Sequence, residues 1–348
     1  MKSERLSRKS GLRNVSGKSL FPEGDVTILP APVTQDFDLV EEENGVFLSN
    51  IDGANIKAFS NIDALPYAFE TTRDVLDWAC ALLHESPSAL SFLKEAQKSG
   101  WRVRLADLPE GGFHLDTQAC LLELDHAGFS PAVIGRSAHF RNALLISFIK
   151  GLRTIWHENR LEEPEYKYTP DAFLALERTR AADADTLTVL VGWELRGGGF
   201  PECWRQILGS DDGDMALVFG CALERNPSSL YNGKALKEAF IQWYEDDLRV
   251  NSSDHAALER LDMALESCSG AAGKEPLKAR TIEDLSLLPD GTLYLRGMGS
   301  SVLKAPAFAG LDDPINQAHL FQIVYDTNVT MSGGVPFRDS SLARKIFP

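Results

Sequence analysis

The sequence predicts an α+β protein that is predominantly helical, with a core of short strands plus a long helix and a helical subdomain after it. Apolar residues recur at helical spacing through most of residues 71–268. The alternation typical of short strands is found mainly in residues 101–124. The composition is that of a soluble globular protein, because 44% of the 348 residues are hydrophobic and 24% are charged. Collagen-like, coiled-coil and wholly disordered chains are therefore excluded.

The first 70 residues divide into a basic tail and a turn-rich segment. Residues 1–20 contain six Lys or Arg and a single Glu, and too few apolar side chains to offset the entropy of ordering. We expect a flexible basic tail here, and a transit peptide is the alternative interpretation. Residues 21–70 mix prolines, an acidic run and short apolar pieces, which predicts extended segments and turns.

Charge and cysteine content restrict the partners and the compartment. The net charge of −15 argues against a nucleic-acid partner, since phosphate binding needs a basic face. We expect no membrane partner, because no run of roughly 18 apolar residues is present, and the basic tail lacks a secretory apolar region. The five cysteines are odd in number and form no C-x-x-C pair, which predicts reduced thiols in a cytoplasmic protein.

The predicted core spans residues 71–200 and begins with a helical hairpin. Apolar side chains repeat at helical spacing over 75–83 and again over 89–96, with Ser86-Pro87 between them. Gly100 is placed to end the second helix. Three short strands are then predicted, at residues 101–105, 112–116 and 119–124.

Two long helices complete this core. Residues 136–159 carry an apolar stripe, with Gly151 in the middle. Glycine there costs about 1 kcal/mol relative to alanine, so something other than helix propensity has placed it. Thr169-Pro170-Asp171 is a typical helix start, and the helix is predicted to run to Arg196, before three glycines.

The rest of the chain is predicted to form a helical subdomain and a small C-terminal extension. The subdomain covers residues 201–268, and residues 269–348 form a linker and the extension, with a strand-like piece at 292–296 and a helix-like piece at 315–325. The subdomain helices are expected from Pro201 through Ile207 and at about 212–224, 233–250 and 254–267.

No standard zinc-hydrolase motif is present. Such a site needs two histidines four residues apart on one helix face, with a glutamate after the first as general base. His84-Glu85 and His157-Glu158 each offer one possible ligand and lack a partner four residues later. Both pairs are most simply solvated helix ends.

Several sequence pieces, together with the order of the elements, form a recognisable pattern. These pieces are residues 176–185, 193–195, 200–204, 226–230, 232–235 and 239–244. They resemble an uncharacterised bacterial family of zincin-like metallopeptidases, over about residues 75–270, a little over half the chain. In zincins the first long helix carries the paired histidines and the second carries an acidic third ligand.

The resemblance also implies where metal ligands would lie. The first helix of the family has a sequence similar to H-E-L-R-H-x-W-Q, and Lys150–His157 is the matching segment here. The second helix has a sequence similar to E-R-x-x-E-A-D-A, and Glu177–Ala184 is the matching segment. Lys150 and Thr154 stand in place of the two histidines, Gly151 in place of the general-base glutamate, and Ala181 in place of the acidic ligand. A lysine ammonium and an alanine cannot ligate zinc, so the familiar site cannot form.

We therefore expect a degenerate zincin-like domain in which the Lys150 ammonium occupies the space of the missing metal. A buried ammonium needs an acidic partner, for which Asp183 and Glu177 are the candidates. The alternative is that Lys150 reaches solvent from an ordinary helix face. In another alternative, metal binds through His157, Glu158 and further groups.

A different chemistry is suggested by Gly135-Arg136-Ser137-Ala138-His139, which approaches the G-x-S-x-G nucleophile elbow after Ala132-Val133-Ile134. The last glycine is replaced by histidine, and the following chain lacks the βαβ order of an α/β-hydrolase. Ser137 is more simply a helix N-cap.

Two function classes follow from these features. The first is a non-catalytic metallopeptidase-like protein without a cofactor, whose groove between helices 136–159 and 170–196 binds a peptide or protein. The second is an active hydrolase, either zinc-dependent with rearranged ligands or serine-dependent through Ser137. The oligomeric state stays open.

Overall fold

The computed structural model describes residues 45–51, 67–160, 167–267, 273–327, 330–332 and 335–337. The expected basic tail and most of residues 21–70 lie outside the described residues, and so do the linker residues 268–272. The helices and strands of the described chain are β1 Val46–Phe47, α3 Thr72–Leu83, α4 Pro87–Lys98, β2 Arg102–Ala106, β3 Phe113–Asp116, β4 Leu121–Asp125, α5 Pro131–Arg136, α6 Ala138–Glu158, α7 Pro170–Gly197, α8 Glu202–Leu208, α9 Gly213–Arg225, α10 Lys234–Trp243, α11 Asp247–Ser267, α12 Ala279–Leu285, α13 Gly299–Lys304, α14 Pro314–Thr327, β5 Thr330–Ser332 and β6 Val335–Phe337.

The predicted fold class is confirmed: the protein is α+β and mostly helical, with one small mixed sheet. The sheet has the order β1-β2-β4-β3, in which β2 and β4 are parallel and the outer pairings are antiparallel. In this register Val103 pairs with Leu122 and Leu105 with Leu124. The buried side chains Val103, Leu122 and Leu124 give the sheet an apolar face for the helices.

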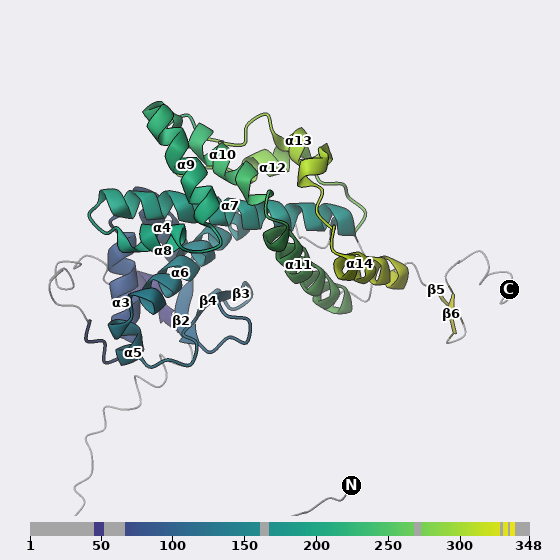
Figure 1. The fold of residues 1–348 in the computed structure, drawn as a ribbon. Coiled ribbons are helices and arrows are strands. Elements are labelled where there is room, and N and C mark those ends of the chain that lie inside the picture. The colour runs from purple at the N-terminus through teal and green to yellow at the C-terminus, as the bar shows by residue number, and fades with distance from the viewer. Residues whose placement is uncertain are drawn as a thin grey trace, which may run out of the picture.

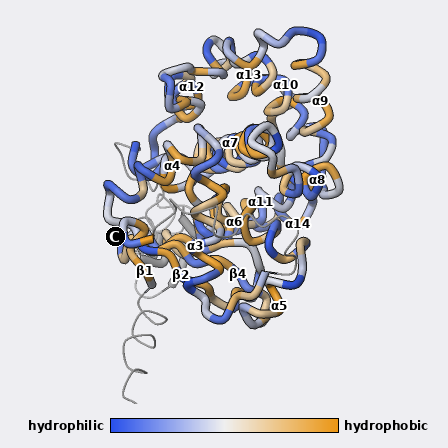
Figure 2. Tube along the Cα trace, turned by 90° about the vertical axis from the view of Figure 1, so that its left-hand side faces the viewer, coloured by the Kyte–Doolittle hydropathy of each residue, from blue (hydrophilic) through white to orange (hydrophobic). Residues whose placement is uncertain are grey.

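The long helix α7 passes through the centre of the molecule (Figure 1). The sheet and α6 lie on one side of it, and α9, α10 and α12 lie on the other. Hydrophobic residues are concentrated in α3, α6, α7 and the strands β2 and β4 (Figure 2). Polar and charged residues of α7 are buried as well, including Glu177, Arg180 and Asp183. Because a buried charge needs a partner, these residues position the candidate site.

Both long helices begin as the sequence predicts. The Thr169 side chain accepts a hydrogen bond from Ala172 N, with Pro170 in the first turn of α7. The Ser137 side chain accepts from Phe140 N at the start of α6. The hairpin of α3 and α4 is joined to α7 by Glu194, whose carboxylate accepts from the Ser88 hydroxyl at 2.8 Å and the Ser88 backbone at 3.0 Å.

Two expectations about local structure are wrong. The predicted helix 233–250 is broken after α10, because Asp246 accepts a hydrogen bond from Leu248 N at 2.8 Å and thereby starts the new helix α11. Residues 292–296, expected to be strand-like, form turns, with one bridge between Leu287 and Leu293. Residues 132–134 belong to the helix α5, so the strand that a nucleophile elbow needs directly before its serine is not there. The helix expected at 315–325 is present as α14.

Within the described ranges, every helix is too short or too polar to cross a bilayer.

Candidate functional site

Lys150 is held between two carboxylates. Its Nζ atom lies 2.6 Å from Asp185 Oδ1, on α7, and 3.2 Å from Asp212 Oδ2, just before α9. Burial alone would lower the pKa of Lys150, but the charges of Asp185 and Asp212 raise it above its ordinary value. The ammonium is therefore fixed in the charged form at neutral pH.

These partners differ from the predicted ones. Asp183 and Glu177 were expected to face Lys150, and solvent was the alternative, but the side chain is paired and only 25% exposed. The reason is that α6 and α7 run in opposite directions. Earlier residues of α6 therefore meet later residues of α7, so that Lys150 reaches Asp185 while Asp183 is opposite Arg153.

Gly151 faces the sheet, and the Leu122 side chain occupies the space that a side chain at position 151 would need. A Cβ atom at this position would lie 2.6 Å from Leu122 Cδ1, closer than real Cβ contacts allow, and 3.0 Å from Cδ2, which is a tight contact. Leu122 is fully buried on β4. The glycine in the middle of α6 is thus explained by the close approach of β4, and a glutamate would have to displace Leu122.

The other two positions that match the family's ligands also lack a metal-binding arrangement. The Thr154 hydroxyl donates to Lys150 O at 3.0 Å, within its own helix. Ala181 packs its methyl group against the hydrophobic core. The residues at these four positions therefore do not fit a zinc ion. Across the described ranges, no group of three or more His, Cys, Asp or Glu side chains is placed to hold a metal ion.

A fully buried polar cluster lies one helical turn beyond Lys150. Arg153 binds both oxygens of Asp183, from Nε to Oδ2 at 2.5 Å and from Nη2 to Oδ1 at 3.1 Å. His157 Nε2 lies 2.8 Å from Asp183 Oδ2, and the Tyr294 hydroxyl donates to Oδ1 at 2.6 Å. Arg153 also donates to the carbonyl oxygens of Leu285 and Leu287, at 2.8 Å and 3.0 Å. The C-terminal extension thus completes the cluster.

The cluster sets the protonation states of its members. Burial would raise the pKa of Asp183, but Arg153 and the hydrogen bonds from His157 and Arg153 lower it to about 2. Burial lowers the pKa of His157, against the opposing effect of Asp183. Burial and the Asp183 charge raise the pKa of Tyr294 well above its ordinary value. At neutral pH the cluster contains an ionised Asp183, a neutral His157 and a neutral Tyr294.

Glu158 and Glu177, the other nearby acids named from the sequence, both pair with arginines. Arg180 donates to Glu177 Oε1 at 3.0 Å and also binds Glu158, while Arg260 of α11 binds the second oxygen of Glu177. Burial would raise the pKa of Glu177, but Arg260 and Arg180 lower it. Glu158 and Glu177 are thus engaged by arginines. His157 was expected at a solvated helix end, but it is 1% exposed and lies against Asp183.

Ser137 is placed as a helix cap. Its hydroxyl accepts from Phe140 N at 3.3 Å, and the ring of His139 lies against Gln206 instead, with Nδ1 at 3.3 Å from Oε1. These contacts match the interpretation of Ser137 as the N-cap of α6.

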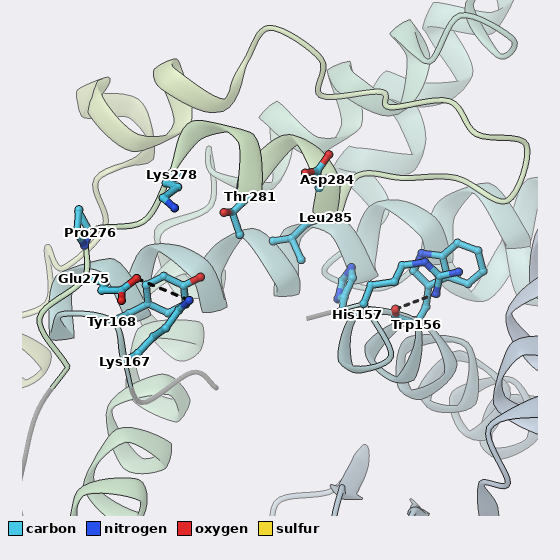
Figure 3. A pocket seen from close by; sticks show the side chains of 11 residues that line it. Trp156, His157, Lys167, Tyr168, Glu275, Pro276, Lys278, Thr281, Asp284 and Leu285 are labelled. Carbon is cyan, nitrogen blue, oxygen red and sulfur yellow. Dashed lines mark hydrogen bonds and ion pairs between the residues drawn. The ribbon is translucent and has the colours of Figure 1, made fainter. Parts of the chain in front are cut away.

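The interface between α6 and α7 is closed by side chains. Arg153, His157 and Asp183 are buried there beside apolar residues such as Leu152 and Leu187. A cavity of about 280 Å³ lies instead beyond the C-terminal end of α6 (Figure 3). Its lining residues are Trp156, His157, Arg160, Lys167, Tyr168, Glu275, Pro276, Lys278, Thr281, Asp284 and Leu285.

Sequence reasoning missed Arg153, Asp185, Asp212 and Tyr294. Arg153 could have been found, because it lies between Ile149 and Trp156 on the apolar stripe of the helix, where a charged residue predicts a buried pair. No local signal marks Tyr294, which is 111 residues from Asp183 in the chain.

One family model matches part of the chain. Residues 133–295 match the model of the Putative metallopeptidase family (DUF6782), so the resemblance seen in the sequence is confirmed over this region. The match begins later than the expected residue 75 and continues past 270, to include Tyr294. No curated protein and no solved structure matches the chain.

Proposed function

We propose that the protein is a non-catalytic member of the metallopeptidase-like class that binds a peptide or protein, with ion pairs where a metal centre would be. The observation that carries this proposal is the position of Lys150 Nζ, 2.6 Å from Asp185 and 3.2 Å from Asp212. An ammonium with two carboxylates is a charge-compensated arrangement, and a dication beside it would be repelled.

The contacts of Gly151 support the same proposal. A hydrolytic metal centre needs a general base beside the metal-bound water. The position that matches the family's glutamate has no side chain, and Leu122 occupies the space that one would need. A side chain at this position would require Leu122 to move.

The residues of this chain that match the family's two motifs also support the proposal of a non-catalytic protein. Arg153 and Asp183 match the motif and form the buried bidentate pair, and Arg178 matches and pairs with Asp254 at 2.8 Å. These three matching residues hold helices together, whereas the positions that would hold metal all differ from the motif. This pattern is expected of a scaffold that has kept its fold and lost its chemistry.

The proposal includes a cytoplasmic location, which the free cysteine thiols support. Cys80, Cys120, Cys203 and Cys221 are free thiols, and Cys80 and Cys203 are buried. Free thiols persist in a reducing compartment. The acidic net charge of −15 supports a peptide or protein partner over a nucleic acid.

Competitive acetylation tests the ion pair directly. Lys150 should react at least about tenfold more slowly than Lys234 with acetic anhydride, because the paired amine is charged and the reagent needs the neutral form. Lys234 is the internal control, since its side chain is 66% exposed. Mass spectrometry of the digested protein gives both rates in one sample. Equal rates would contradict the pairing of Lys150.

Metal content and proteolysis test the absence of catalysis. The full chain is incubated with equimolar zinc, dialysed and analysed for bound metal, and a fluorescent casein substrate is followed with and without chelator. We expect no stoichiometric zinc and no chelator-sensitive cleavage. Stoichiometric zinc with cleavage that a chelator abolishes would overturn the proposal, and fluorophosphonate labelling of Ser137 would favour a serine hydrolase.

A further inference from the structure

The cavity beyond α6 contains two buried polar atoms without a partner. His157 Nδ1 and Trp156 Nε1 have no hydrogen-bond partner among the described residues, although the two side chains are only 1% and 6% exposed. Buried polar atoms are normally paired, and leaving one unpaired costs about 1–3 kcal/mol. Both side chains line the cavity, so a ligand that enters it and shifts these side chains can satisfy the two atoms.

The two atoms differ in hydrogen-bonding role. His157 Nε2 lies 2.8 Å from Asp183 Oδ2. Because that carboxylate is ionised, the ring proton is on Nε2, and Nδ1 of the neutral ring is an acceptor. Trp156 Nε1 is a donor only. A ligand that satisfies both must offer an N–H or O–H group and an acceptor oxygen.

Positive charge lines both sides of the cavity. Beside the two unpartnered atoms, Arg160 lies over the Trp156 ring, 3.3 Å from its centroid, and is 3.7 Å from Glu95. Figure 3 shows Trp156 and His157 at one side and Lys167, Tyr168 and Glu275 at the other, with Thr281 and Leu285 of α12 between them. Lys167 is 3.7 Å from Glu275, and Asp284 is engaged by Arg280 at 2.9 Å. Lys278 is exposed and forms no ion pair with any described residue, so its charge is available to an anionic group.

We propose that this cavity binds the C-terminal residue of a peptide. The amide N–H of that residue donates to His157 Nδ1, a peptide carbonyl accepts from Trp156 Nε1, and the terminal carboxylate pairs with Lys278. The inference deepens the proposed function and rests on its binding component, because it names the group that the protein recognises.

Simpler ligands satisfy only part of this site. An inorganic anion pairs with Lys278 but has no donor for His157 Nδ1 unless it is protonated. An internal peptide segment supplies the amide N–H and the carbonyl, and it supplies a negative charge only where it contains Asp or Glu. A chain terminus supplies a carboxylate whatever its side chain, next to an amide N–H and the neutral carbonyl of the preceding residue.

Nuclear magnetic resonance of the histidine rings tests the site in the full chain. The protein is labelled with ¹⁵N-histidine and titrated with a pool of N-acetylated dipeptides that have free carboxylates and mixed side chains. A matched pool with C-terminal amides and inorganic phosphate are titrated separately. The signal of His157 Nδ1 is assigned from a His157→Gln sample.

The expected result is a shift of the His157 Nδ1 signal with the carboxylate pool, with apparent affinity at least about tenfold weaker for the amide pool. Phosphate should leave the signal unchanged. Absence of a shift with the carboxylate pool, equal affinity for the two pools or an equal response to phosphate would each overturn the proposal.

Variants identify the contacts. Lys278→Gln should reduce the affinity for the carboxylate pool about tenfold and remove the preference over the amide pool. Lys274→Gln is the matched control, because Lys274 is exposed on the same segment and does not line the cavity. Trp156→Phe keeps an aromatic ring and removes the donor, so it should weaken both pools equally. An unchanged preference in Lys278→Gln would contradict the assignment of the carboxylate.

The result is separable from the test of the proposed function. Peptide binding is measured at His157, whereas the proposed lack of catalysis is judged from zinc content and cleavage. Either measurement can fail while the other succeeds.

Discussion

The Arg153 guanidinium binds both carboxylate oxygens of Asp183, and neither side chain is exposed to solvent. The pair joins the two long helices at the centre of the molecule, and it also connects them to α12 through the carbonyl oxygen of Leu285. A bidentate arginine–carboxylate contact fixes orientation as well as distance. The alignment of α6 against α7 is therefore specified at this point.

Breaking this pair should be strongly destabilising. Arg153→Met leaves the Asp183 charge buried with only His157 and Tyr294 as hydrogen-bond partners. We expect the free energy of unfolding to fall by about 3–5 kcal/mol, measured by urea denaturation. The double variant Arg153→Met/Asp183→Leu should recover part of this loss, because no unpaired charge remains. Additive losses in the double variant would show that the two residues are not energetically coupled.

The packing of Gly151 predicts opposite effects for two glycine substitutions. Gly151→Ala should lower the free energy of unfolding by about 1–3 kcal/mol, since its Cβ would overlap Leu122. Gly220→Ala is the control: it lies inside α9, and a Cβ added there would meet no atom within 4 Å. That substitution should stabilise by about 0.5–1 kcal/mol through helix propensity. Thermal denaturation of both variants gives the comparison, and a neutral Gly151→Ala would contradict the tight approach of β4.

The neutral state of His157 predicts a pH dependence of stability. Burial lowers its pKa in the folded protein, so the unfolded chain takes up a proton more readily. The contribution of His157 to the free energy of unfolding is complete above the ordinary histidine pKa of about 6.5 and is lost as the pH falls below that value. Urea denaturation at about pH 7.5 and about pH 5.5 should show this loss, and His157→Gln should reduce it.

Asp183 adds a second transition at lower pH. Its folded pKa of about 2 lies below its ordinary value of 3.8. Its contribution is therefore complete above about pH 4 and is lost as the pH falls toward 2. An acid titration followed by circular dichroism should show that Asp183→Asn unfolds at a higher pH than the unchanged protein, because the variant lacks the ionised carboxylate at every pH. Coincident acid transitions in the two proteins would exclude Asp183 as the group responsible.

Removing the Lys150 charge should cost more than removing an exposed lysine. Lys150→Met leaves Asp185 and Asp212 facing each other, and we expect a loss of about 2 kcal/mol in the free energy of unfolding. Lys234→Met, at a side chain 66% exposed, should change it by less than about 0.5 kcal/mol. Equal effects on urea denaturation would show that the Lys150 pairs contribute no more than a surface contact.

The candidate site was only partly visible in the sequence. The motif comparison located the correct segments of both helices and identified Asp183 as a nearby acid, because spacing within one helix fixes which residues share a face. It assigned the wrong partner to Lys150, because the alignment of two helices depends on where each packs against the other. Asp212 and Tyr294 reach the site from distant segments, and no local pattern encodes such contacts.

The amino-acid order by itself determined the fold class, the two long helices, their caps and the absence of the ligand motif, because these depend on side-chain chemistry and spacing within a few residues. The tertiary structure alone decided which charges are paired, why Gly151 is required beneath Leu122 and where a cavity opens. Those properties arise when segments far apart in the chain are brought into contact and water is excluded between them, so that each buried charge must find its partner across the fold.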